Sequence, residues 1–447
     1  MSSATLHLRQ LGNSFVLTFT RQALNILVGL GFAILVPRML GPKDYGIYSL
    51  VVLLPSMLVT FFNLGVGPAT AYFVSSKEVR TEEAAKANLL LGGILCLVAV
   101  GTGSIVIFFG ADVLFQGVPV ILLVLGLCIV PVNLLTGLMN SMFQGVQDFK
   151  RFNIITLLPT LIALVIAFIG LCFFNGSVRT LIFANVTGFG AAFALCLWWL
   201  KGDLLATPAG EKYTYIKRCL SYGWKAHLSN ILAFFNYRID MFLLNMFLGP
   251  AAIGIYSVSV HIAERLWMVS QAVSTVVFPR IAELKSNETV RQQITPFITR
   301  WVLIITFGAA VIAALCAPWI IRLLFGVKFQ QSAVVLQLLL PGILLGAGSR
   351  VLSNDIAARG RPELNTWVAL LTVIINIAAN ILLIPRMGVN GAAVATTVSY
   401  SINAVIKVAI YSKLTGLTLG TILSFSEIEK SFLKTRAAAS NTKKSVP

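Results

Sequence analysis

The sequence predicts an all-α polytopic membrane protein. Hydrophobic residues make up 57% of the 447 residues and charged residues only 11%, against about 25% charged in ordinary soluble domains. Apolar runs of about 20 residues, the length that crosses a bilayer as a helix, recur from one end of the chain to the other. This composition excludes a single soluble core.

Twelve apolar runs are long enough to be membrane-spanning helices. They lie at residues 14–36, 45–74, 87–110, 118–140, 154–174, 179–200, 223–248, 253–278, 301–325, 333–357, 366–386 and 390–412. The run at 45–74 is long for one span, and we expect that span to end near Leu64. The first run is long enough to be a span itself, so no cleavable signal peptide is predicted.

Lysine and arginine are distributed unevenly over the predicted loops. With the N-terminus in the cytoplasm, 23 of the 34 Lys and Arg lie on the cytoplasmic side, 6 on the other side and 5 within spans. Cytoplasmic loops of membrane proteins carry such an excess, so we predict a cytoplasmic (inner) membrane protein with both termini in the cytoplasm. The net charge of +18 follows from this bias and from contact with anionic membrane lipids. No nucleic-acid partner is predicted.

A repeated motif divides the chain. LGPKDYGIYSL at 40–50 recurs as LGPAAIGIYSV at 248–258. We predict an N-terminal six-helix lobe at 1–200, a cytoplasmic linker at 201–222, a C-terminal six-helix lobe at 223–412 and a cytoplasmic polar tail at 413–447. Because each lobe has an even number of spans, both begin on the same side, and the repeats are parallel.

Ionisable residues lie within the predicted spans. Arg238 and Asp240 are near the middle of the seventh span, where each costs about 2.5–3.5 kcal/mol to insert. Being two positions apart, they do not face each other along the helix. Each therefore needs a partner on another helix, in water or in a ligand.

Further polar residues on four predicted spans accompany this pair. Span 8 brings His261, Glu264 and Arg265 together on one side of its helix, and span 1 carries Arg21 and Asn25 on one polar stripe. Asn230 begins the seventh span. Arg350 and Asp355 lie close to the cytoplasmic end of the tenth span, where we expect them to snorkel or to cap the helix.

Two interpretations of the mid-span charges remain open. Asp240 can pair with Arg265, and Arg238 with Glu264, so that the charges join helices of the second lobe. Alternatively, Arg21, Arg238 and Arg265 line a hydrated cavity between the lobes and bind an anion, for which the planar guanidinium is well suited. Asp240 or Glu264 can also couple transport to an ion, since burial raises and a nearby arginine lowers a carboxylate pKa.

These motifs resemble a known family. An arginine in span 1, LGP-x-x-YGIYS, R-x-D in span 7 followed by LGP-x-x-x-GIYS, and LIPRMGVNGAA before the last span are similar to the polysaccharide-exporter, O-antigen-type branch of the multidrug/oligosaccharidyl-lipid/polysaccharide flippase superfamily. The resemblance covers residues 10–412. It implies a V-shaped bundle of two lobes that moves polyprenyl-diphosphate-linked glycans across the membrane by alternating access.

The resulting hypothesis is a flippase and not an enzyme. Arg21, Arg238 and Arg265 would bind the diphosphate, Asn25, Asn230 and His261 the rest of the head group, and Asp240 and Glu264 would orient the arginines or couple transport to H⁺ or Na⁺. Other polysaccharide-assembly proteins are expected partners, and no cofactor or metal site is predicted. The alternative is a cation-coupled multidrug exporter. A glycan-transferring enzyme is disfavoured because no predicted external loop exceeds about a dozen residues to present acid–base groups at the interface.

Overall fold

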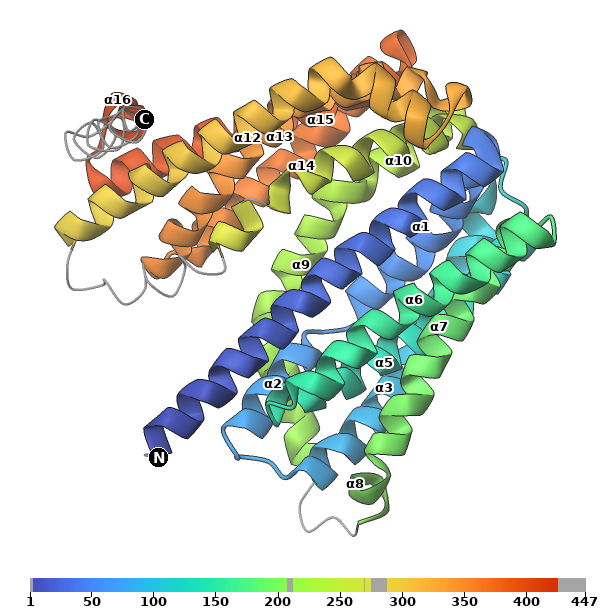
Figure 1. Cartoon of the computed structure of the whole chain (residues 1–447), viewed down its shortest axis with the longest axis vertical. Coiled ribbons are helices and arrows are strands. Elements are labelled where there is room, and N and C mark those ends of the chain that lie inside the picture. Colours follow the sequence, from blue (N-terminus) through green and yellow to red (C-terminus); the bar gives the residue numbers. More distant parts are fainter. Residues whose placement is uncertain (1–2, 207–211, 269, 275–287, 425–447) are drawn as a thin grey trace, which may run out of the picture. The chain divides into compact units, whose positions relative to one another are not determined.

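The computed structural model describes residues 3–206, 212–268, 270–274 and 288–424, with the side chains of 3–23, 25, 212, 225 and 226 left aside. Every regular element in these residues is a helix (Figure 1). Ten helices in this part of the chain are long and apolar enough to cross a membrane. The predicted all-α polytopic class is confirmed.

The helices follow the predicted spans closely. In chain order they are α1 Ser3–Phe62, α2 Val66–Ser75, α3 Thr81–Leu114, α4 Val120–Leu127, α5 Ile129–Gly145, α6 Phe149–Phe173, α7 Val178–Trp199, α8 Lys201–Leu205, α9 Lys212–Leu248, α10 Pro250–Arg265, α12 Glu288–Leu324, the 3₁₀ turn η2 Val327–Phe329, α13 Gln331–Ala358, α14 Pro362–Met387, α15 Val389–Thr415 and α16 Leu419–Leu423. Each predicted span coincides with one or two of these helices, as far as its residues are described.

The difference between twelve predicted and ten observed spans has two causes. The first two predicted spans are joined in α1, which has 60 residues and would be about 90 Å long if straight. It is interrupted at Gly41, whose φ of 79° and ψ of 175° are not helical. The span at 253–278 falls on α10, which has 16 residues, and on residues beyond the described ones. The expected end of the second span near Leu64 is confirmed, because Leu64 and Gly65 both have positive φ before α2 begins.

Both copies of the Leu-Gly-Pro motif break a helix in the same way. Gly41 and Gly249 have φ angles of 79° and 78°, a conformation that glycine adopts without strain. The proline that follows each glycine resumes the helix, where its missing N–H costs nothing. The repeat in the sequence is therefore a repeat of backbone geometry.

The two copies also pack against each other. A Cβ atom at Gly46 would lie 1.7 Å from the carbonyl oxygen of Pro250, and one at Gly254 would lie 2.0 Å from that of Pro42. The contact is reciprocal: the glycine of each copy meets the proline of the other. This is the pattern expected of two equivalent segments related by a pseudo-twofold axis.

By compactness the chain forms two units. Unit 1 consists of residues 1–261, 317–335 and 380–392, and unit 2 of residues 262–316, 336–379 and 393–447. The boundaries of these units cut through α10 and α12 to α15. The predicted linker at 201–222 contains α8 and the first turns of α9. The predicted lobes, the linker at 201–222 and the tail at 413–447 remain predictions.

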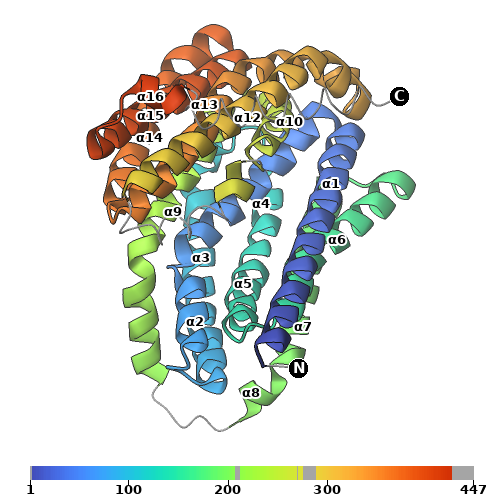
Figure 2. The same cartoon turned by 60° about the vertical axis from the view of Figure 1, so that its left-hand side comes forward.

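Unit 1 is closely packed through small residues. Ala69, Ala84, Ala85 and Ala87 are fully buried in one cluster where α2, α3, α5, α7 and α9 meet, and α6 lies beside α7 (Figures 1 and 2). Helices in membranes associate through such small residues because their backbones can approach closely.

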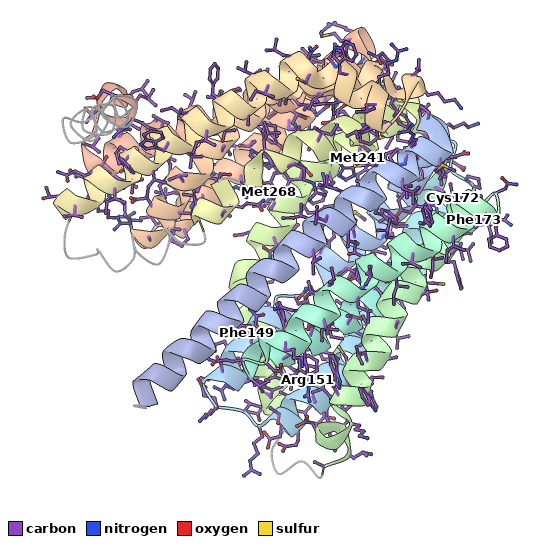
Figure 3. All side chains as sticks on the ribbon, viewed as in Figure 1. Phe149, Arg151, Cys172, Phe173, Met241 and Met268 are labelled. Atoms are coloured by element: carbon purple, nitrogen blue, oxygen red, sulfur yellow. The ribbon has the colours of Figure 1, made fainter. Side chains whose placement is uncertain are left out.

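Large apolar side chains lie on the outside of the helices. Phe108 is 81% exposed and Trp319 is 80% exposed, and Phe173 projects outward at one end of α6, opposite the end that carries Arg151 (Figure 3). An apolar exterior of this extent suits contact with lipid chains rather than water.

Candidate functional site

The structure places the predicted site residues in different surroundings. The side chains of Arg21 and Asn25 lie outside the described residues. Asn230 is exposed on α9. Arg238, Asp240 and His261 belong to unit 1, whereas Glu264 and Arg265 belong to unit 2.

Asp240 is the most buried ionisable group of the predicted site. It is 5% exposed, and Tyr256, its neighbour on α10, is 1% exposed. The Tyr256 hydroxyl donates a hydrogen bond to Oδ2 of Asp240, and the Met241 backbone N–H donates to Oδ1 at 2.8 Å. A carboxylate in a membrane helix is stabilised by such donors, so this pair joins α9 to the second repeat motif.

Other polar groups surround this helix corner. The Asn245 amide, fully buried, donates to the Leu114 carbonyl at 3.1 Å. Oδ1 of Asn236, one turn before Asp240, has no hydrogen-bond donor among the described residues. A buried acceptor of this kind can accept a hydrogen bond from a proton donor or bind a cation.

Arg238 turns toward its own backbone and the first repeat. It is half-buried, and its guanidinium donates to the Tyr237 carbonyl at 3.0 Å. It also interacts electrostatically with Tyr45 of the first repeat motif. Thus Arg238 interacts with Tyr45 of the first repeat motif, and Asp240 with Tyr256 of the second. This agrees with the prediction that Arg238 and Asp240 do not face each other along the helix.

The remaining predicted residues lie along α10. His261, Glu264 and Arg265 are all half-buried, and His261 and Arg265 are four residues apart, which places them on one helix face. The pairings Asp240–Arg265 and Arg238–Glu264 remain predictions, as does a cavity between the lobes.

Unit 2 contains a pair of cations that the sequence interpretation did not assign to the site. Arg350 of α13 stacks on the Trp267 ring, with its Cζ 5.2 Å from the ring centroid, and it acts electrostatically on Lys407 of α15. No ion pair to Lys407 occurs among the residues described. The sequence feature that could have identified Lys407 is its position within a predicted span, because a charged residue there is a functional candidate by default.

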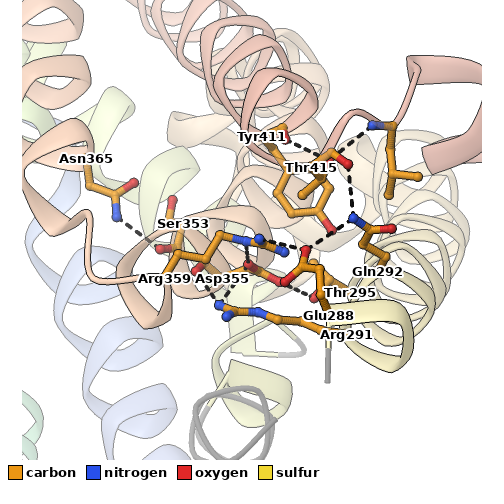
Figure 4. A network of polar contacts seen from close by, with 11 residues as sticks. Glu288, Arg291, Gln292, Thr295, Ser353, Asp355, Arg359, Asn365, Tyr411 and Thr415 are labelled. Carbon is orange, nitrogen blue, oxygen red and sulfur yellow. Dashed lines mark hydrogen bonds and ion pairs between the residues drawn. The ribbon is translucent and has the colours of Figure 1, made fainter. Parts of the chain in front are cut away.

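The prediction for Asp355 was wrong, because its carboxylate neither snorkels nor caps at the surface. Asp355 is fully buried and forms ion pairs with Arg291 at 3.0 Å and with Arg359 at 2.5 Å (Figure 4). Thr295 donates a further hydrogen bond at 2.5 Å. Burial lowers the pKa of Arg359, but Asp355 and Glu288 outweigh this effect and raise it. With these five side chains fixing one another, the network is structural, and it links the start of α12 to the end of α13.

Comparisons with known proteins agree with this architecture. The model of the family described as "Polysaccharide biosynthesis protein" matches residues 35–334. A putative O-antigen transporter of Shigella flexneri is 19% identical over 393 residues, covering 84% of this chain and 92% of the relative. A probable low-salt glycan biosynthesis flippase, Agl15 of Haloferax volcanii, is 23% identical over 219 residues, which is 48% of this chain and 46% of that relative.

Solved structures share the fold. The lipid II flippase MurJ in an inward closed conformation superimposes with a TM-score of 0.72 at 15% identity, covering 92% of this chain and 89% of MurJ. An inward-facing multidrug resistance transporter of the MATE family gives 0.68 at 16% identity, with 88% and 94% covered. These likenesses concern the fold alone.

The membrane-spanning helices and their polar residues define a multi-pass membrane protein, and its fold is shared with transporters of known structure. Within that class, the chain belongs to the family of polysaccharide biosynthesis proteins. The resemblance deduced from the repeat motifs is confirmed.

Proposed function

We propose that this protein is a flippase that translocates a lipid-diphosphate-linked oligosaccharide, such as a polysaccharide or O-antigen repeat unit, across the cytoplasmic membrane by alternating access. Family membership and the names of the matched relatives support the substrate class. In the proposed orientation both termini are cytoplasmic.

One observation carries the proposal: cationic side chains persist within the membrane-spanning helices. Arg350 and Lys407 lie within electrostatic range of each other in unit 2, and Arg238 lies half-buried in unit 1. Two like charges in a medium of low dielectric constant repel each other strongly. A diphosphate offers the oxygens that guanidinium and ammonium groups bind, so an anionic guest suits a region where two cationic side chains lie near each other.

The individual roles follow from this assignment. Arg21, Arg238 and Arg265 are the residues that we expect to bind the diphosphate, and within unit 2 Arg350 and Lys407 attract an anionic group. Asn25, Asn230 and His261 form hydrogen bonds with the head group. Asp240, with Tyr256 on one carboxylate oxygen, couples transport to H⁺ or Na⁺ or orients the arginines, and Glu264 has the same assignment. The protein moves its substrate without changing it chemically, and it works beside other proteins of polysaccharide assembly.

Deletion of the gene tests the function. We expect deleted cells to lose surface glycan and to accumulate lipid-linked oligosaccharide that glycan-cleaving enzymes reach only after the cells are opened. The full chain supplied on a plasmid should reverse both changes. Normal surface glycan in the deletion strain, with no accumulated intermediate, would contradict the proposal.

A cation-coupled multidrug exporter remains the alternative because the fold is shared. The cationic pair Arg350–Lys407 argues against it, since a site for organic cations needs net negative charge. Gradient-driven uptake of ethidium into inverted vesicles, above that of empty vesicles, would favour the alternative.

A further inference from the structure

A groove on unit 1 lies apart from the site above. It has a volume of about 800 Å³ and is lined by residues of α2, of the following loop and of the start of α9, among them Tyr72, Glu78, Lys217, Arg218, Ser221 and Tyr222. Gly65 and Gly223 let the two helices approach closely. A Cβ atom at Gly65 would lie 2.4 Å from the Gly223 carbonyl oxygen, and one at Gly223 would lie 2.4 Å from the Leu64 carbonyl oxygen. The start of α2 and the start of α9 are therefore in direct backbone contact, and together they form one side of the groove, the α2–α9 wall.

The lining combines aromatic rings with charge. Tyr72 and Tyr222 are stacked, with ring centroids 5.0 Å apart and planes 13° apart, and both are nearly half exposed. Arg218 forms an ion pair with Glu78 and covers the Phe73 ring at 4.6 Å. With Glu78 offset by Arg218, Lys217 gives the groove a net positive charge.

The position of the groove along α9 indicates the level of the membrane surface. The span that the sequence predicts on this helix begins at residue 223, and the groove residues of α9 lie within two turns before it. Tyrosine and lysine are typical of this level, where rings and ammonium groups meet lipid head groups.

An apolar stripe leads from the groove into the span. Lys217, Ser221, Trp224 and Leu228 follow one another at intervals of three or four residues, so they share one face of α9. Trp224 is 61% exposed and Leu228 is 45% exposed. A polar, cationic groove that continues into an exposed apolar stripe matches a molecule with an anionic head and a long hydrocarbon tail.

We propose that this groove binds an anionic phospholipid of the adjacent leaflet. Lys217 and the free edge of the Arg218 guanidinium contact the phosphate, the tyrosine hydroxyls and Ser221 form hydrogen bonds with the head group, and one acyl chain lies along Trp224 and Leu228. Charge complementarity at the groove and continuity with the apolar stripe distinguish this occupant from a soluble anion. The lipid would anchor the α2–α9 wall while other helices of the protein move.

Lipid retention by the purified full chain tests the proposal. The protein is taken from micelles containing equal parts of phosphatidylglycerol and phosphatidylcholine, and bound lipid is counted by native mass spectrometry. We expect preferential retention of phosphatidylglycerol, reduced about five-fold by Lys217→Gln, since one basic residue near a membrane contributes about 1 kcal/mol. Trp224→Ala should weaken retention through the tail while leaving the charge intact.

The matched control is Lys150→Gln, which removes an exposed lysine at the start of α6 without touching the groove. It should retain phosphatidylglycerol as the unmodified chain does. Equal loss in Lys150→Gln and Lys217→Gln, or equal retention of the two phospholipids, would overturn the proposal. Displacement of phosphatidylglycerol by farnesyl diphosphate at far lower concentration would also overturn it, because the groove would then bind the diphosphate of a transported lipid.

Discussion

Tyr256 donates a hydrogen bond to Asp240 in the second repeat, and the first repeat has no such pair. The two motifs are 208 residues apart, so Tyr48 corresponds to Tyr256 and Phe32 corresponds to Asp240. The ring centroids of Tyr48 and Phe32 lie 6.2 Å apart. The Tyr48 hydroxyl accepts a hydrogen bond from the amide of Asn185 at 3.0 Å instead. An aromatic position of the first repeat is thus an acidic position in the second, so the repeats share a backbone but differ in chemistry.

Removing the two hydroxyls should have unequal effects. Tyr256→Phe leaves a buried carboxylate oxygen without its donor, and hydrogen bonds to charged groups contribute about 1.5–3 kcal/mol. Tyr48→Phe removes a bond between neutral groups, for which about 0.5–1.5 kcal/mol is typical. We expect thermal unfolding in detergent to show the larger loss for Tyr256→Phe.

Asp240→Asn supplies the control for this comparison. In that background the charge is already gone, so Tyr256→Phe should cost no more than Tyr48→Phe. Equal losses in the unmodified background would show that the Asp240–Tyr256 bond has no special importance.

The reciprocal contact of the repeats predicts a strong effect of single methyl groups. Gly46→Ala and Gly254→Ala each place a Cβ atom within 2.0 Å of a carbonyl oxygen, and overpacking costs about 1–3 kcal/mol or more. Gly93→Ala in α3 is the control, because a Cβ atom there meets nothing within 4 Å and alanine favours the helix. Size-exclusion profiles after heating should show early aggregation for the first two variants only; a stable Gly46→Ala protein would contradict the observed packing.

The buried network around Asp355 predicts another large effect. Asp355→Ala would leave Arg291, which is 3% exposed, without its counter-charge, and breaking a buried pair from one side costs about 3–5 kcal/mol. Glu363→Ala removes a partner of the exposed, 4.0 Å pair with Arg361 and should cost about 1 kcal/mol or less. Similar unfolding temperatures for the two variants would show that the Asp355 network contributes little.

Long apolar runs made the helices predictable. A span of about 20 apolar residues has few alternatives to a helix in a bilayer, since backbone groups must be satisfied internally. The two interruptions at Gly41 and Leu64 were also visible in the sequence, as an LGP motif and as an overlong run. What the repeat did not reveal was that its copies touch, because spacing along the chain does not specify which surfaces meet.

The polar contacts were harder to predict for the same reason. Asp355 was expected at the surface because it lies near a helix end, yet its partner Arg291 comes from α12, 64 residues earlier. Tyr256 was part of the repeated motif but received no role, since tyrosine in a span is usually an interfacial or packing residue. Lys407 is one of the five Lys and Arg within the predicted spans and was therefore a functional candidate, but its proximity to Arg350 could not be read from the sequence.

The orientation proposed from the Lys and Arg distribution predicts the labelling of single cysteines. In a cysteine-free background, Arg179→Cys should react with a membrane-impermeant maleimide in intact cells. Lys150→Cys, at the start of α6, should react only after permeabilisation; both Lys150 and Arg179, which lies at the start of α7, are exposed. The reverse pattern would place the termini outside.

The central claim is that cationic groups within the spans bind the anionic part of a lipid-linked glycan. Its most direct measurement is surface glycan in the deletion strain carrying Lys407→Ala, Arg238→Ala or, as a control, the exposed-site variant Arg179→Ala, each at normal membrane level. We predict that the first two restore little glycan, that Lys407→Arg restores most of it, and that the control restores all. Full restoration by both Lys407→Ala and Arg238→Ala would contradict the account.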